Sequence, residues 1–63
     1  MCESNVFIKQ EDKEELFYKE AVRIIPTGED EFIIEGLLGE PQKIQGKIKE
    51  INLIGHKIVF EKK

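Results

Sequence analysis

The residue best suited to chemistry is Cys2, the single cysteine of the 63-residue chain. If Met1 is removed, Cys2 offers an amine nitrogen and a thiolate sulfur that can chelate one metal ion together. If Met1 stays, its amine, the deprotonated Cys2 amide and the thiolate offer a similar set. Two such termini meeting across a dimer axis suit nickel(II) or copper(II), because thiolate is soft and these ions accept a planar field. The alternative is that Cys2 is a small apolar residue at the start of a strand.

The single histidine, His56, lies where a hairpin turn is predicted. We favour a turn role over a ligand role, because a hairpin tip needs a polar residue that tolerates unusual φ values. One thiol and one histidine cannot complete a four-ligand zinc site within one chain. The acidic runs 11–15 and 29–31 have no facing histidine and are interpreted as solubilising charge. A metal site must therefore be shared between chains.

The sequence shows no pattern of catalytic residues. It has no nucleophile with a neighbouring base and no glycine loop of the kind that cradles phosphate. A single domain over residues 1–63 buries only roughly 60% of its unfolded surface, which excludes a deep cleft between lobes. We therefore expect no enzyme. A core of this size supplies about 3–5 kcal/mol, and association is a common remedy, so we expect a homodimer.

The hydropathy pattern predicts no membrane association. The longest apolar runs have three residues or fewer, against the roughly 20 that span a bilayer. The chain also starts without a basic segment followed by an apolar stretch, as a secretory signal would require. Together with an unpaired cysteine, this composition indicates the reducing cytoplasm.

Charge is uneven along the chain. Residues 1–20, 21–42 and 43–63 carry −3, −4 and +4, which sum to −3. A basic final third could neutralise phosphates, so a small RNA-binding module is the alternative function. These lysines alternate with apolar residues, however, as on the solvated face of a strand, and we favour that interpretation. The lysines concerned are Lys43, Lys47, Lys49, Lys57, Lys62 and Lys63.

The segments that must position these residues mostly have the sequence features of β-strands. Residues 5–8 and 31–37 are rich in β-favouring side chains, and 43–49 alternate strictly between apolar and polar. The apolar positions then change parity, which predicts a bulge or bend near Lys49 and Glu50, or a strand that switches faces at a barrel corner. A two-residue hairpin turn is expected after Ile54, with Gly55 taking positive φ, before a returning strand over 58–60.

The stretch from Asp12 to Ile25 fits two structures. As a helix it would have Asp12 as N-cap and Glu15 as its capping-box partner. As a strand it alternates, and it leads into a proline turn with strands on either side. We predict a strand from about Leu16 to Ile25. Five to seven short strands without a helix must hide their edges, so the sequence predicts an all-β fold, a small and partly open β-barrel.

The opening Met1-Cys2-Glu3-Ser4-Asn5-Val6-Phe7 resembles the M-C-x-x-x-V-[YF] start of the CooT family of small nickel-binding proteins. The segment Leu38-Gly39-Glu40, the block Gln45-Gly46-Lys47-Ile48-Lys49-Glu50-Ile51-Asn52-Leu53 and the following His56-Lys57-Ile58-Val59 are similar to that family's second half. The resemblance covers nearly the whole chain. Its most specific feature is the cysteine at position 2 combined with the later block.

This resemblance implies a dimeric, cytoplasmic, nickel-binding accessory protein linked to the maturation of carbon monoxide dehydrogenase. It implies Cys2 of each subunit as metal ligand, and it assigns no ligand role to His56. Many relatives are also labelled as RNA-binding because such barrels are similar to SH3 and Sm modules. The net negative charge and the absence of an aromatic cluster argue against that label here. A thiol sensor, with Cys2 joining two chains as a disulfide, is a third possibility.

Overall fold

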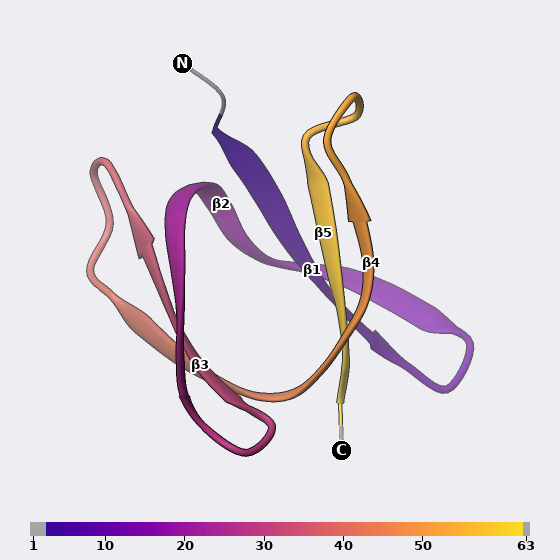
Figure 1. Ribbon diagram of the computed structural model, residues 1–63. Coiled ribbons are helices and arrows are strands. Elements are labelled where there is room, and N and C mark those ends of the chain that lie inside the picture. Colours follow the sequence, from indigo (N-terminus) through magenta and orange to yellow (C-terminus); the bar gives the residue numbers. More distant parts are fainter. Residues whose placement is uncertain (1–2, 63) are drawn as a thin grey trace.

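The computed structural model describes residues 3–62 as a single β-sheet rolled into a barrel (Figure 1). Neighbouring strands pair antiparallel in chain order, and β5 pairs parallel with β1, so the hydrogen-bonded ring is closed. The all-β small barrel predicted from the sequence is confirmed, and the β1–β5 pairing completes a ring that was expected to be partly open. The strands are β1 (Ser4–Gln10), β2 (Lys13–Gly28), β3 (Glu31–Gly36), β4 (Gln42–Asn52) and β5 (Lys57–Lys62).

The segment with two interpretations is a strand, β2, and it is longer than predicted. Its first half pairs with β1 and its second half with β3, and Ala21 is paired on both sides, with Ser4 and Gly36. Between the halves, Glu20 has a φ of 58°, a left-handed conformation that turns the strand. One long strand thereby forms a corner of the barrel and belongs to two pairings.

The β4–β5 hairpin confirms one sequence expectation and corrects another. The register shifts between Ile48 and Glu50, which is the predicted bulge. The predicted two-residue turn with Gly55 at positive φ is wrong, because β4 ends at Asn52 and β5 begins at Lys57. The left-handed residue is His56, with φ 53°. In the loop over residues 53–56, the left-handed conformation is taken by the last residue, His56, and not by Gly55.

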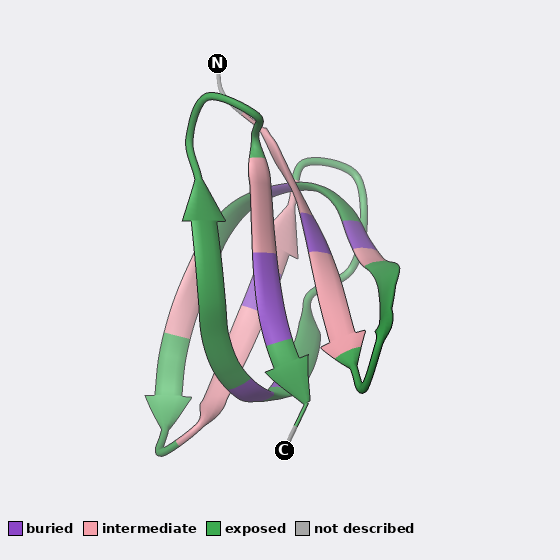
Figure 2. Cartoon of the chain, turned by 90° about the vertical axis from the view of Figure 1, so that its right-hand side faces the viewer, coloured by how far each residue is buried: buried purple, intermediate pink, exposed green. Residues whose placement is uncertain are grey.

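The core lies in the middle of the strands, and the loops are exposed (Figure 2). Phe60 is fully buried at its centre and makes an edge-to-face contact with Phe32, with ring centroids 5.2 Å apart. Burial of these apolar side chains is the main favourable contribution to folding. The buried side chains are Val6, Tyr18, Ala21, Ile34, Ile44, Val59 and Phe60.

Closing five strands around so small a core forces one close backbone approach. Gly46 has a φ of 157°, and a Cβ at this position would lie 2.5 Å from the backbone oxygen of Glu61. Its amide also donates to the Asp30 carbonyl at 2.8 Å. Glycine is therefore required where β4 curves across β5. Over residues 3–62, the structure contains no helix with the length and hydropathy to cross a membrane.

Candidate functional site

The predicted metal ligands, Met1 and Cys2, lie outside the described residues, which begin at Glu3. What the structure defines is the framework to which they are attached. We call the end of the barrel where β1 begins the N-terminal end. Figure 1 shows that the β3–β4 connection and the β4–β5 loop reach this same end, while the β2–β3 hairpin lies at the opposite one.

Asn5 fixes the start of β1 from two sides. Its backbone amide donates to the His56 carbonyl at 2.8 Å. Its side-chain oxygen accepts from the Glu20 amide at 3.1 Å, beside the bend in β2. This role was not predicted from the sequence. An asparagine at the start of a strand was an available signal, because its side chain readily bonds neighbouring backbone groups. The start of β1 is thus held on both sides.

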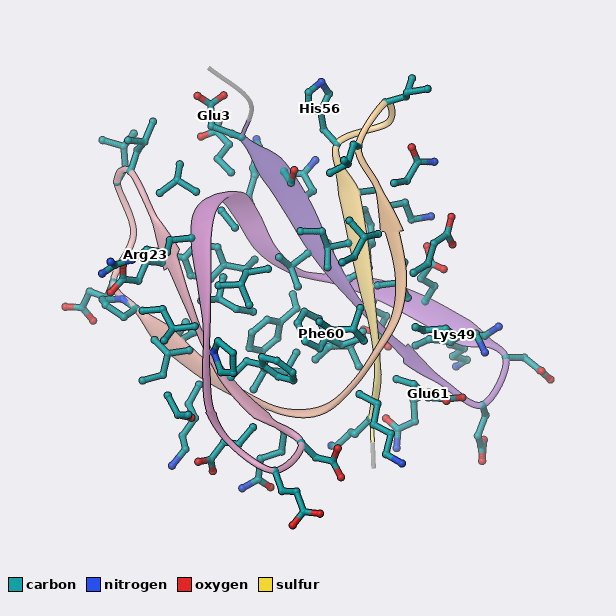
Figure 3. All side chains as sticks on the ribbon, viewed as in Figure 1. Glu3, Arg23, Lys49, His56, Phe60 and Glu61 are labelled. Atoms are coloured by element: carbon teal, nitrogen blue, oxygen red, sulfur yellow. The ribbon has the colours of Figure 1, made fainter. Side chains whose placement is uncertain are left out.

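His56 shapes the loop next to this position. Its left-handed conformation turns the chain into β5, and its carbonyl receives the Asn5 amide. Asn52 supports the same loop, since its side-chain oxygen accepts from the Gly55 amide at 2.8 Å. Figure 3 shows the side chains of Glu3 and His56 both directed outward at the N-terminal end. The backbone role of His56 agrees with the turn role predicted from the sequence.

No group of three or more metal-binding side chains, counting histidine, cysteine, aspartate and glutamate, is found between residues 3 and 62. The acidic runs 11–15 and 29–31 were interpreted as solubilising charge. Glu31 bonds Lys43 and Gln45, and Glu14 pairs with Lys57, so these carboxylates already serve cations and amides of the chain.

Two loops at the N-terminal end expose aliphatic side chains. Leu37 and Leu38 in the β3–β4 connection are 61% and 95% exposed, and Leu53 and Ile54 in the β4–β5 loop are 76% and 95% exposed. We call these two segments the apolar loops. The first is held by Tyr18, whose hydroxyl donates to the Glu40 carbonyl at 3.0 Å. Hydrogen bonds from Tyr18 and Asn52 support these loops, whose exposure was not predicted from the sequence.

The lysines of the final third are partly paired with acids. Lys43 lies 3.1 Å from Glu31 and Lys49 lies 3.7 Å from Glu61. Lys57 pairs with Glu14 and lies 5.0 Å above the Phe7 ring. The bond to Glu14 raises the pKa of Lys57, and the bond from Lys43 is the main cause of a lowered pKa of Glu31. Three of these cations therefore interact with acids of the chain itself.

Comparison with known proteins gives a consistent result. The family model described as CO dehydrogenase accessory protein CooT matches residues 1–61. A crystal structure assigned as a CooT from Carboxydothermus hydrogenoformans superposes with a TM-score of 0.89 at 39% sequence identity, covering 98% of each chain. No curated protein matches this chain.

Proposed function

The chain belongs to the CooT family of CO dehydrogenase accessory proteins, and from that premise we propose that it binds one Ni(II) ion between two copies of itself through Cys2. The observation that carries the proposal is the family match, which includes Cys2 within residues 1–61. We further propose that it acts as a cytoplasmic homodimer and transfers the ion during maturation of a nickel enzyme such as carbon monoxide dehydrogenase.

The donor chemistry supports nickel as the cargo. Two Cys2 thiolates and two backbone nitrogens from the residues Met1 and Cys2 would form a set of soft and borderline donors. Such a set suits Ni(II) in a planar field and suits calcium or magnesium badly, because those ions require oxygen. The coordinating thiol must be deprotonated, so binding should release protons and strengthen as the pH rises.

The place where the chain enters β1 supports transfer rather than storage. The chain enters β1 at the rim of the barrel, where Asn5 is held by His56 and Glu20. An ion bound next to this rim would be within reach of an incoming ligand. A client enzyme could then take the ion by ligand exchange, without unfolding the barrel.

The test is a nickel titration of the reduced protein, followed by absorbance and native mass spectrometry. We expect one nickel ion per two chains and a thiolate-to-nickel absorption band. Cys2→Ser should abolish the band and lower the affinity by at least 100-fold, because the soft donor is lost. His56→Ala is the matched control, since it removes an exposed imidazole at the same end, and it should retain the band. An unchanged nickel site in Cys2→Ser would refute the proposal.

A further inference from the structure

We infer that the barrel binds an extended peptide segment of a partner protein in a hollow at the end where β1 and β5 terminate. The segment carries an apolar side chain and a carboxylate at alternate positions. Figure 1 shows that β1 and β5 run together toward this end, away from the start of β1. The inference goes beyond the proposed function, since no residue of the hollow is proposed to bind nickel. We call it the terminal hollow, and its lining residues are Ile8, Phe17, Lys43, Ile44, Gln45 and Lys62.

The floor of the terminal hollow is apolar. Ile44 belongs to the buried core, and Ile8 and Phe17 pack partly buried against that core. The hollow has a volume of about 340 Å³, and a cavity of about 150 Å³ is enough to hold a benzene ring. Pockets that enclose a whole small ligand measure about 300–1,000 Å³, so this hollow is near their lower limit. It therefore fits one or two side chains of a peptide better than a complete cofactor.

Two strand edges border the terminal hollow. In the part of the chain that the structure describes, residues 13–18 of β2 pair with β1 alone and residues 42–45 of β4 pair with β3 alone. The second edge of each segment therefore has no partner strand there, and Figure 2 shows the first half of β2 as the outermost strand on the right. Phe17 and Ile44 line the hollow from these two segments. An extended peptide can add to such an edge through backbone hydrogen bonds, while its alternate side chains point into the hollow.

Lys62 supplies an uncommitted positive charge to the terminal hollow. It makes no ion pair within the part of the chain that the structure describes. Lys43, the other cation of the hollow, lies 3.1 Å from Glu31 and already serves that carboxylate. Among the described residues, no acid lines the terminal hollow. Although the whole chain carries a net charge of −3, a carboxylate that enters this hollow meets Lys62 and no like charge.

A smaller hollow adjoins the terminal hollow and restricts where the carboxylate can lie. It has a volume of about 190 Å³ and shares Ile8, Phe17 and Lys62 with the terminal hollow. Glu15 lines only the smaller hollow, so a carboxylate placed there meets a like charge. RNA fits this surface poorly, because phosphate binding requires several cations and base stacking requires a platform of aromatic rings. One uncommitted lysine above an apolar floor suits a single carboxylate close to an apolar side chain.

The experiment is an NMR titration of the wild-type protein with the blocked peptide TVTFTET, whose apolar and acidic side chains all face one side when it is extended. We expect saturable shifts of the amides of residues 13–18 and 42–45 below about 1 mM peptide, while the amides of residues 53–56 stay unchanged. The peptide TVTFTKT, with lysine in place of glutamate, should bind at least about 10-fold more weakly. The absence of saturable shifts, or shifts confined to other residues, would overturn the inference.

A charge reversal tests the role of Lys62 in the same titration. Lys62→Glu should weaken binding of TVTFTET by at least about 10-fold, because the carboxylate of the peptide then meets a like charge. Lys47→Glu is the matched control, since Lys47 also makes no ion pair in the described chain but does not line either hollow. It should bind the peptide as wild type does. Spectra without peptide show whether each variant is folded, and a folded Lys62→Glu with wild-type affinity would contradict the inference.

Two further titrations of the wild-type protein test the mode of binding and the kind of partner. A TVTFTET peptide with methylated backbone nitrogens keeps every side chain but cannot donate backbone hydrogen bonds, so it should bind at least about 10-fold more weakly. Equal affinity of the methylated peptide would refute addition to a strand edge. The same amide shifts produced by a single-stranded oligouridine would assign the hollow to RNA, and those produced by raising the protein concentration alone would assign it to a second copy. Either result would overturn the inference.

Discussion

The N-terminal end of the barrel and the β2–β3 hairpin at the opposite end have contrasting surfaces. At the hairpin, Glu31 accepts bonds from Gln45 and Thr27 and lies 3.1 Å from Lys43, so its polar groups bond one another. At the N-terminal end, the side chains of Asn5, Asn52 and Tyr18 bond backbone groups, and the two apolar loops expose aliphatic side chains.

This contrast separates an end whose polar side chains bond one another from an end that exposes aliphatic side chains. Charged side chains that bond one another are stable in water and gain little from a second protein. Aliphatic side chains on loops that are fixed by backbone bonds gain from being covered, and little ordering entropy remains to be lost on binding. The same end carries the start of β1, to which Cys2 is attached.

The largest effect is expected from Gly46→Ala, at the hairpin end of the barrel. The new Cβ would lie 2.5 Å from the Glu61 backbone oxygen, so β4 and β5 would have to separate. We expect a loss of about 2–3 kcal/mol in the free energy of unfolding, measured by urea denaturation. The comparison of the two ends assumes that β4 and β5 are held firmly together at Gly46. Gly46→Ala tests this assumption most directly.

Gly28→Ala is the matched control for that substitution. A Cβ at Gly28 would have only ordinary contacts, the nearest being 3.7 Å from the Glu31 Oε1 atom. We expect a free energy of unfolding that is unchanged or higher by up to about 1 kcal/mol, because alanine restricts the unfolded chain. Equal destabilisation by the two substitutions would show that the β4–β5 approach is not the cause.

An intermediate effect is expected from Tyr18→Phe, which loosens the first apolar loop. The Tyr18 hydroxyl donates to the Glu40 carbonyl at 3.0 Å, and the ring lies against Gly36 and Gly39. Loss of this partly buried hydrogen bond should cost about 1 kcal/mol in the free energy of unfolding. Hydrogen exchange should also become faster in residues 37–40, where the loop depends on that bond.

Thr27→Val removes a hydroxyl from the hairpin end and serves as the comparison for Tyr18→Phe. The Thr27 hydroxyl is exposed and makes long contacts to Glu31, at 3.3 and 3.4 Å. Its loss should change the free energy of unfolding by less than about 0.5 kcal/mol. If Tyr18→Phe proves equally mild, the first apolar loop is not held by this bond and the contrast between the two ends weakens.

Much of the fold could be predicted from the sequence, because the signals are local. Alternation of apolar and polar residues identified the strands, and the parity change before Ile51 located the bulge. The strand at Leu16 to Ile25 was predicted correctly, but its bend at Glu20 was not, since glutamate rarely adopts positive φ and gives no signal for it. The positive φ was predicted at Gly55 because glycine adopts it readily, whereas in the structure the residue with positive φ is His56.

The candidate site, like the fold, could be predicted from the sequence only in part. Cys2 and Met1 were chosen for their chemistry, and their ligand roles stay predictions because both lie outside the described residues. The hold on Asn5 and the position of the apolar loops beside it depend on pairings between residues far apart in the sequence. Such contacts follow from the closed ring, so they became visible only with the structure.

The smallest effect is expected at the hairpin, from titration of Glu31. The bond from Lys43, followed by that from Gln45, lowers the pKa of Glu31 below its usual value of 4.5. A carboxyl with a lowered folded-state pKa stabilises the fold above its unfolded-state pKa, and this contribution is lost as the pH falls through the folded-state pKa. The stability difference between wild type and Glu31→Gln should therefore be full at pH 7, narrow below about pH 4.5 and shrink in 1 M salt. Thermal unfolding from pH 7 to pH 3 measures this difference.

Glu29→Gln is the control, because Glu29 has no bonded partner within residues 3–62. A Glu31→Gln stability curve that runs parallel to that of wild type at every pH would show that the hairpin charges do not stabilise this end.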